Sequence, residues 1–425
     1  MLDSGWRAWA ASAFERRRLM LGADAYATLV MASLPLSTTA TAILLIPWLV
    51  ILLPTLDTAM IRREIMTVAG GTPLILLALA TLGTLWADVS WTERLWGVDG
   101  YLKLLCIPLL FAQFRRSPNG HWPILAFFVA ALVLLAWSWA LVLIPDLPWR
   151  GKSFGVPVKD YITQSEVFAL CSFAALGYAA DLWRKRQRRL AFALICAAAA
   201  FVANIMYVET GRTTLVIIAV LALIFGYWNF GWKGIVAAAA AASVLAAVFW
   251  TSSTYLRDRV THIAEEVQLY ETLNEPTSTG ARFDFWRNSL ASFARAPIIG
   301  HGTGSIPQEL RSTISPETGL SSIGTVNPHN EILVAAIQLG AIGTIVLFVM
   351  WTSHLLLFRG DGLISWIGVI AVVQNMVSCL ANSHLSDFTQ GWLYVFAVGV
   401  LGGTALRLGL VTVTPERAVV EAAAI

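Results

Sequence analysis

The sequence predicts an all-α integral membrane protein with about twelve transmembrane helices, because its composition and its apolar pattern do not suit a water-soluble globule. Hydrophobic residues fill 57% of the 425 positions, charged residues fill only 13%, and the mean hydropathy is +0.69. Apolar runs recur along the whole length, and a helix needs about 20 such residues to cross a bilayer. We therefore expect a single polytopic membrane domain over residues 1–425.

Hydropathy sets the order of the expected spans along the chain. They cover residues 23–37, 40–54, 71–87, 99–114, 122–143, 165–183, 190–206, 213–231, 235–252, 331–357, 363–380 and 392–408. The alternative for the first two spans is one long helix over 25–54. Arg7 and Arg16–Arg18 precede them, and we expect a retained interfacial helix there, because no small-residue cleavage site follows a compact apolar core.

Basic residues indicate the orientation, since short cytoplasmic loops carry an excess of Lys and Arg. With twelve spans and a cytoplasmic N-terminus, most of the 29 basic residues fall inside, including the cluster at 184–189. A single helix over 25–54 would instead put Arg62 and Arg63 outside. The pattern favours two short helices and places both termini in the cytoplasm.

One outside segment, residues 253–330 between the ninth and tenth spans, is too long for a plain connection and is expected to be functional. Within it, 254–272 and 281–296 carry apolar residues at spacings that suit amphipathic helices. Such helices would lie on the membrane face of the bundle and roof a cavity. The stretch 297–304 is expected to form a Gly-rich turn, and without a preceding strand it is weak evidence for nucleotide binding.

Two arginines on outside segments are candidates for binding a diphosphate. Arg212 lies at the mouth of the eighth span, where an arginine is costly unless it pairs or faces a wet cavity. Arg282 begins the second helix of the large loop. The alternatives are an Arg212 that snorkels to headgroups and an Arg282 on a solvated helix face. If the two converge, their forked donors suit a pyrophosphate.

His329 is the candidate proton acceptor, in the segment Asn327–Pro328–His329–Asn330–Glu331. Asn327 is expected to cap the tenth span and Pro328 to begin it, which would put His329 in the first helical turn. A histidine kept neutral near pH 7 can take a proton from a hydroxyl. The alternative is a histidine that only caps the helix. His384 and Asp387 on the last outside loop are further candidates, with plain loop polarity as the alternative.

Several classes of function and site are disfavoured. The net charge of +3 suggests no nucleic-acid-binding face, and no clustered carboxylates suggest a metal. The cysteines are expected to be small buried side chains, because they fall in apolar runs without metal-ligand spacing: Cys106, Cys171, Cys196 and Cys379. The acidic residues near Trp86, Trp91 and Trp96 are expected to belong to an interfacial aromatic belt. A transporter or flippase would need charges strung through several spans or a repeated half, and neither is seen.

Four short motifs in order along the chain resemble the bacterial O-antigen ligase, polymerase and O-oligosaccharyltransferase superfamily. The first three are Thr210–Gly211–Arg212, Arg282–x3–Trp286 and Pro297–x2–Gly300–x–Gly302–x–Gly304. The fourth is His329–Asn330–x2–Leu333–x6–Gly340–x2–Gly343. The resemblance covers the twelve-span layout and residues 207–343, and the size and the single large loop look most like an O-antigen ligase.

The resemblance implies a GT-C-like, metal-independent, inverting glycosyltransferase that needs no cofactor. It would move a glycan from undecaprenyl pyrophosphate to lipid A–core oligosaccharide among the lipids at the periplasmic face of the bacterial inner membrane. His329 would be the base, and Arg212 and Arg282 would bind the pyrophosphate. Further candidates for contacting the lipid-linked glycan are Arg150, Lys152, Trp286 and Asn330. An O-antigen polymerase or a protein O-oligosaccharyltransferase with the same donor is the nearest alternative.

Overall fold

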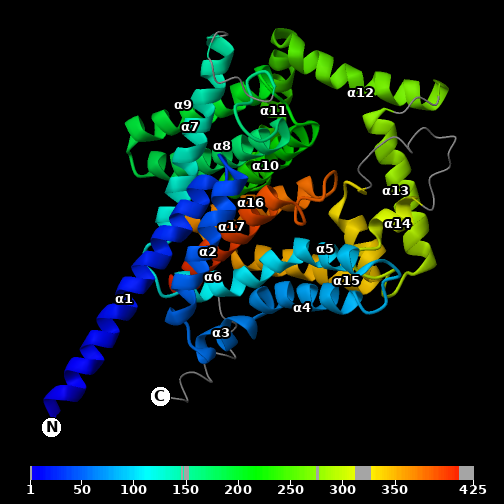
Figure 1. The fold of residues 1–425 in the computed structure, drawn as a ribbon. Coiled ribbons are helices and arrows are strands. Elements are labelled where there is room, and N and C mark those ends of the chain that lie inside the picture. The colour runs from blue at the N-terminus through cyan, green and yellow to red at the C-terminus, as the bar shows by residue number, and fades with distance from the viewer. Residues whose placement is uncertain (1, 145–146, 148–152, 274–276, 312–326, 411–425) are drawn as a thin grey trace.

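The computed structural model describes residues 2–144, 147, 153–273, 277–311 and 327–410, and these residues form an all-helical bundle (Figure 1). They contain no β-strand, only an isolated bridge between Ser153 and Val156. The α-helices of the first half are α1 (Leu2–Ser33), α2 (Thr38–Leu52), α3 (Thr58–Ile65), α4 (Val68–Gly83), α5 (Trp91–Leu102), α6 (Cys106–Phe114), α7 (His121–Leu143), α8 (Tyr161–Arg184) and α9 (Arg188–Tyr207). Those of the second half are α10 (Arg212–Phe230), α11 (Trp232–Ser252), α12 (Thr254–Leu273), α13 (Ser278–Arg295), α14 (Ile306–Arg311), α15 (Glu331–Leu357), α16 (Leu363–Ser378) and α17 (Phe388–Arg407). Short 3-10 turns follow α2 (η1, Leu53–Thr55) and α5 (η2, Lys103–Leu105).

Each of the twelve predicted spans overlaps a helix, but fewer helices qualify as spans. Nine described helices are long and apolar enough to cross a membrane, or ten if α3 and α4, which meet at 88°, form one bent span. α16 is too short to qualify, with 16 residues. α1 is one continuous helix that includes the expected interfacial segment, and its apolar part after Arg18 is short. The multi-pass membrane architecture is confirmed, whereas a count of twelve is not.

The alternative of one long helix over 25–54 is wrong. α1 ends at Ser33 and α2 begins at Thr38, where the Ser37 side chain accepts a hydrogen bond from the backbone N–H of Ala40. The two helices pack against each other, with the hydroxyls of Ser33 and Thr41 2.9 Å apart. The chain therefore reverses between them.

The segments expected outside gather at one end of the bundle. Lys159, before α8, donates hydrogen bonds to the Leu34 carbonyl between α1 and α2 and, over 3.2 Å, to the Thr389 hydroxyl at the start of α17. At the other end, Arg115 after α6 lies 3.3 Å from the Glu64 carboxylate of α3, and both were expected inside. These contacts agree with the predicted grouping of these segments, while the alternation of all the spans and the compartment that each end faces stay predictions.

α15 is broken at Gly340, and the Gly-rich turn over 297–304 fills the break. Gly340 has φ +64°, so the helical hydrogen bonds stop there. The N–H groups of His301 and Gly302 donate to the carbonyls of Ile337 and Gln338, at 2.8 and 2.9 Å. In return the N–H of Ala341 donates to the Pro297 carbonyl over 2.8 Å. These exchanges satisfy the broken backbone, as an irregular segment inside a membrane bundle requires.

Glycine is required on both sides of this contact. A Cβ on Gly340 would lie 2.3 Å from the Ile298 carbonyl oxygen, and one on Gly304 would lie 2.4 Å from that of Glu93 on α5. The turn is therefore wedged between α15 and the segment that joins α4 to α5. The glycines of the third and fourth motifs build this wedge.

Burial distinguishes the centre of the bundle from its lipid-facing edge. In α17, 89% of the apolar stretch that could cross a membrane is buried within the protein, whereas in α11 only 6% of the corresponding stretch is buried. Cys106, Cys171 and Cys379 are buried as predicted, whereas the prediction is wrong for Cys196 on α9, which is exposed.

The two helices predicted in the large loop are confirmed as α12 and α13. Figure 1 shows α12, α13 and α14 together at one edge of the bundle, at the right of the view. α13 packs against α15 and α12 packs against α9, α11 and α13. The loop therefore covers the end of the bundle at which α10 and α15 begin.

Candidate functional site

Arg212 is fixed at the start of α10 by the residues around it. The N–H of Gly211 donates to the Ser165 hydroxyl of α8 over 3.2 Å, and a Cβ on Gly211 would lie 2.8 Å from that oxygen. The Thr214 hydroxyl lies 2.8 Å from the same atom. The chain can approach α8 this closely only with glycine before Arg212, and the arginine is thereby directed toward the large loop.

The guanidinium of Arg212 is held by α12 and α13. Its two terminal nitrogens donate to the two carboxylate oxygens of Glu266 at 2.9 and 2.7 Å, and one of them also donates to the Thr279 hydroxyl at 2.9 Å. The Nε of Arg212 is buried without a partner among the described residues. The Arg212 guanidinium thus already binds a carboxylate through two parallel hydrogen bonds, and it could bind two phosphate oxygens in the same way.

Two further arginines, Arg259 and Arg282, lie near Arg212, and Tyr161 at the start of α8 is close to all three. The Arg259 guanidinium of α12 stacks on the Tyr161 ring at 4.9 Å, and its Nε is buried and unpaired within the described ranges. Arg282 of α13 is half-buried and makes no hydrogen bond or ion pair with any described residue. Tyr161 is near enough to interact electrostatically with both Arg212 and Arg282.

The arginines repel each other as well as attracting anions. Burial lowers the pKa of Arg282, and the nearby charge of Arg212 lowers it further, although Tyr161 and Glu266 oppose the shift. A desolvated cluster of this kind is stabilised when an anion enters it. Arg259 and Tyr161 were missed in the sequence, because neither lies in a motif and only the fold brings α8 and α12 together.

His329 lies in a loop that is fixed from several sides. Its own N–H donates to the Asn327 side-chain oxygen over 2.9 Å, and that oxygen also accepts from the Ser383 hydroxyl at 2.7 Å. The indole of Trp286 on α13 donates to the Pro328 carbonyl at 3.0 Å. His329 itself has φ +48°, an unusual backbone conformation for a non-glycine residue that this network holds in place.

The predicted helix start at Asn327 is wrong. Asn330 is the N-cap of α15, and its side-chain oxygen accepts from the N–H groups of Ile332 and Leu333 at 2.9 and 3.2 Å. Its amide nitrogen donates to the Leu380 carbonyl at 2.9 Å. Local propensity cannot separate two asparagines three residues apart, and the contact with Leu380 decides between them. His329 therefore precedes the helix and projects from a loop.

The surroundings of His329 keep its imidazole neutral. Burial lowers its pKa below the ordinary value of 6.5, and the positive charges of Arg282 and His384 lower it further. The ring packs beside Phe285, with centroids 6.3 Å apart, and neither ring nitrogen has a partner in the described part of the chain. A neutral, unengaged imidazole beside an arginine cluster can accept a proton.

His384 has the opposite charge preference. It is buried, and its Nδ1 lies 3.2 Å from the Glu166 carboxylate of α8 while its Nε2 lies 3.8 Å from that of Asp387. Burial lowers the pKa of His384, but Glu166 and Asp387 outweigh burial and raise the pKa above 6.5. The two candidates on the last loop, His384 and Asp387, therefore form an ion-paired group with Glu166, and His384 is near His329.

The remaining candidates have mixed standing. Trp286 and Asn330 both hold the His329 loop through the contacts above, and a direct contact with a glycan stays a prediction for each. Arg150 and Lys152 lie outside the described residues. Among the residues that the structure describes, no group of three His, Cys, Asp or Glu side chains is arranged to hold a metal ion.

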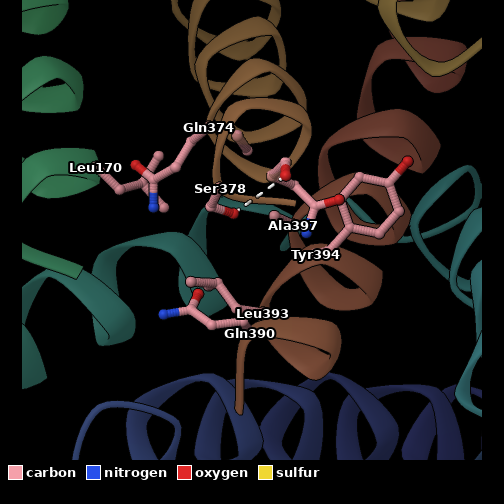
Figure 2. A pocket seen from close by; sticks show the side chains of 9 residues that line it. Leu170, Gln374, Ser378, Gln390, Leu393, Tyr394 and Ala397 are labelled. Atoms are coloured by element: carbon pink, nitrogen blue, oxygen red, sulfur yellow. Dashed lines mark hydrogen bonds between the residues drawn. The ribbon is translucent and has the colours of Figure 1, made fainter. Parts of the chain in front are cut away.

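A small cavity lies deeper in the bundle, and its lining includes Gln374 and Ser378 of α16 and Gln390 and Tyr394 of α17 (Figure 2). Its volume is about 10 Å³, close to the least that holds one water molecule. The side-chain oxygen of Gln374 and the nitrogen of Gln390 are buried there without partners in the described ranges. The cavity suits a bridging water and is too small for a sugar or a diphosphate.

Comparison with known proteins agrees with the resemblance drawn from the motifs. Residues 197–348 match the model of a family described as O-antigen ligase, and this stretch contains Arg212, Arg282 and His329. An uncharacterised protein of Haemophilus influenzae (strain ATCC 51907 / DSM 11121 / KW20 / Rd) is 26% identical over 141 residues. That alignment covers 31% of this chain and 35% of the relative, so it spans about a third of the relative's length.

Proposed function

We propose that this chain, a membrane protein of the O-antigen ligase family, transfers a glycan from undecaprenyl pyrophosphate to lipid A–core oligosaccharide. The family match supports a membrane glycosyltransferase of the ligase or polymerase type. The finer assignment rests on the motifs that look most like a ligase. In this proposal the protein lies in the bacterial inner membrane, with the site at its periplasmic face.

The reaction is a single displacement. The acceptor hydroxyl oxygen attacks the anomeric carbon, the bond from that carbon to the pyrophosphate oxygen breaks, and the hydroxyl proton passes to His329. Attack opposite the leaving group inverts the configuration at the anomeric carbon. The pyrophosphate leaves with the bonding electrons, and the arginines stabilise its growing charge.

The observation that carries the proposal is the pairing of a neutral histidine with an arginine cluster at one end of the bundle. Arg282 is close enough to lower the pKa of His329, so the base and the anion site are neighbours. A general base that was already protonated could not take the hydroxyl proton. The cluster that would bind the pyrophosphate therefore also keeps the base in its working form.

The ion pair between Arg212 and Glu266 adds a step to donor binding. Arg212 already binds both oxygens of Glu266, so a diphosphate must either displace that carboxylate or bind first to Arg282 and Arg259. Displacement costs one ion pair and forms a charge-assisted contact with more oxygens. Since α12 carries Glu266, donor binding would loosen α12 from the start of α10.

The test is a reconstituted transfer assay with an undecaprenyl-pyrophosphate-linked glycan and three separate acceptors: lipid A–core, a second lipid-linked glycan and a pilin-like protein. We expect extension of lipid A–core. A general base contributes roughly 10²–10⁴-fold, so His329→Ala should lower the rate by that factor while donor binding is largely kept. Since the arginines replace a metal at the leaving group, the rate should survive excess EDTA.

His262→Ala is the matched control, because His262 is an exposed histidine of α12 whose ion-pair partner among the described residues is Glu265. It should transfer at the wild-type rate. Extension of the second lipid-linked glycan would make the protein a polymerase instead, and extension of the pilin-like protein would make it a protein O-oligosaccharyltransferase. Full transfer by a stably folded His329→Ala variant would remove the histidine from the mechanism.

A further inference from the structure

A second cavity lies beside the His329 loop, and Arg212, Arg259 and Arg282 are not among the described residues that line it. It has a volume of about 530 Å³, within the roughly 300–1,000 Å³ range of small-molecule pockets. α5, the Gly-rich turn, α15 and the 383–386 loop enclose it. Its walls include Trp96, Asp99 and Tyr101 of α5, together with Asn327 and Gln338.

The lining suits a sugar and does not suit a phosphate. The described residues around the cavity include two carboxylates, Glu93 and Asp99, together with several amides and hydroxyls, and none of these described residues is a lysine or an arginine. Arg311 of α14 is the basic residue that interacts electrostatically with Glu93, from outside the lining. Carboxylates and amides pair with sugar hydroxyls, whereas a bound diphosphate would be repelled here and attracted to the cluster around Tyr161.

Two aromatic residues in the lining are placed to bind a ligand. Trp96 is 80% exposed, so its ring face is open for a sugar to stack on. Tyr101 is 3% exposed, and its hydroxyl is buried without a hydrogen-bond partner among the described residues. Asp99 likewise makes no hydrogen bond or ion pair with a described residue. An unpaired buried hydroxyl is costly unless something in the cavity pairs with it.

Asn327 joins this cavity to the proposed base. It lines the cavity, and its side-chain oxygen accepts the N–H of His329 at 2.9 Å and the hydroxyl of Ser383, another lining residue, at 2.7 Å. A ligand in the cavity therefore lies next to the His329 loop, and Arg282 of the cluster is also near His329. An acidic subsite and a basic subsite that both adjoin the base match an acceptor and a charged donor, respectively.

We propose that the cavity between α5 and α15 binds an uncharged sugar ring of the glycan that accepts the transferred chain. This inference rests on the proposed function and names the acceptor side of its site. The ring stacks on Trp96, and its hydroxyls pair with Asp99 and the Tyr101 hydroxyl. One hydroxyl of the glycan then faces His329.

The experiment measures the acceptor KM and the donor KM separately in the reconstituted assay. Trp96→Ala should raise the acceptor KM by roughly two- to tenfold, since an aromatic contact is lost. Tyr101→Phe removes only one hydrogen bond and should raise it by a similar factor. Neither should change the donor KM. Tyr101→Phe should also leave the melting temperature unchanged or higher, because the hydroxyl has no protein partner among the described residues.

Trp91→Ala is the matched control, since Trp91 is a 63% exposed tryptophan of the same helix that does not line the cavity. It should leave both KM values unchanged. A second measurement needs no transfer: equilibrium dialysis without donor measures how tightly the purified protein binds the delipidated acceptor oligosaccharide. There Trp96→Ala should bind more weakly than wild type, and Trp91→Ala should not.

The outcomes separate this inference from the proposed function. Normal transfer with unchanged acceptor KM and binding in Trp96→Ala and Tyr101→Phe overturns the inference and leaves the function standing. A raised donor KM in place of a raised acceptor KM also overturns it, by assigning the cavity to the donor glycan. Oligosaccharide binding that depends on Trp96, in a protein that extends no acceptor, supports the cavity and overturns the function.

Discussion

Two histidines lie close together beside the arginine cluster, and their surroundings move their pKa values in opposite directions. His384 is paired with Glu166 and Asp387, which raise its pKa, whereas burial and Arg282 lower the pKa of His329. The two imidazoles are therefore shifted apart, His384 toward its charged form and His329 toward its neutral form. That division gives His329 alone the role of proton acceptor.

The pH profile of transfer tests this division. A base works only when it is unprotonated, so activity falls as the pH drops through the pKa of His329, and the midpoint should lie below 6.5. Arg282→Gln removes a charge that lowers this pKa, so the midpoint should move up, while Arg282→Lys should leave it near the wild-type value. The measurement is kcat/KM for the acceptor on both sides of pH 6.5.

His262→Ala should leave the acid limb in place, since this histidine is exposed and its ring nitrogen lies against the Glu265 carboxylate of the same helix. A midpoint above 6.5, or one that Arg282→Gln does not move, would contradict the electrostatic link between the arginine and the base. Arg282→Gln also weakens donor binding in the proposed mechanism. The comparison therefore uses the pH at the midpoint of the acid limb and not the absolute value of kcat/KM.

At the scale of elements, the break in α15 positions both sides of the site. The half of α15 before Gly340 begins next to His329, and its carbonyls at the break hold the Gly-rich turn that walls the sugar cavity. A change at Gly340 should therefore act at a distance on the base and on the acceptor. The turn and the helix form one unit because each satisfies the backbone of the other.

Gly340→Ala tests that unit. Alanine at φ +64° is strained by about 1–3 kcal/mol, and its Cβ would lie 2.3 Å from the Ile298 carbonyl oxygen, so the turn must move. We expect a lower melting temperature in detergent and reduced transfer. Gly22→Ala in α1 is the control, because its Cβ would meet Ile51 at an ordinary 3.4 Å. Equal melting temperatures for the two variants would contradict the close packing of the Gly-rich turn against the break in α15.

The sequence predicts those parts of the fold that depend on local composition. Apolar runs predicted a helix at each of the twelve expected spans, and amphipathic spacing predicted α12 and α13, whereas α3 and α14 were not predicted. Ser37 and Asp160 cap their helices as hydrogen-bond acceptors in the usual way. The break at Gly340 was not predicted. Its apolar neighbours continue the helical pattern on both sides, and only contact with a turn some forty residues earlier interrupts the backbone hydrogen bonds.

The residues of the candidate site likewise fall into those that local motifs predict and those that depend on contacts between distant segments. Arg212, Arg282 and His329 were identifiable because short motifs and their membrane side mark them. The partner of Arg212, Glu266, and the role of Trp96 were not identifiable, because each depends on a segment far away in sequence. Trp96 was assigned to an aromatic belt, which its exposure alone would suit, and only the approach of the Gly-rich turn makes it the wall of a cavity.

At the scale of the whole molecule, every proposed role requires that one end of the bundle face the periplasm. Arg212, Arg282, His329 and the sugar cavity share that end, and the basic turn between α8 and α9 lies at the opposite end of α8. Since basic turns stay in the cytoplasm, the site should face outward. An inverted protein would turn its arginine cluster away from a donor presented at the outer leaflet.

Cysteine labelling decides the orientation. With the exposed Cys196 replaced by alanine, the native cysteines that remain are buried. Glu265→Cys on α12, where the side chain is 60% exposed, should react with an impermeant maleimide in cells whose outer membrane is permeabilised. Gln187→Cys, in the exposed turn between α8 and α9, should react only after lysis, which also serves as the control that both sites are reactive. The reverse pattern would place His329 in the cytoplasm, where an acceptor on the periplasmic face is out of reach of the base.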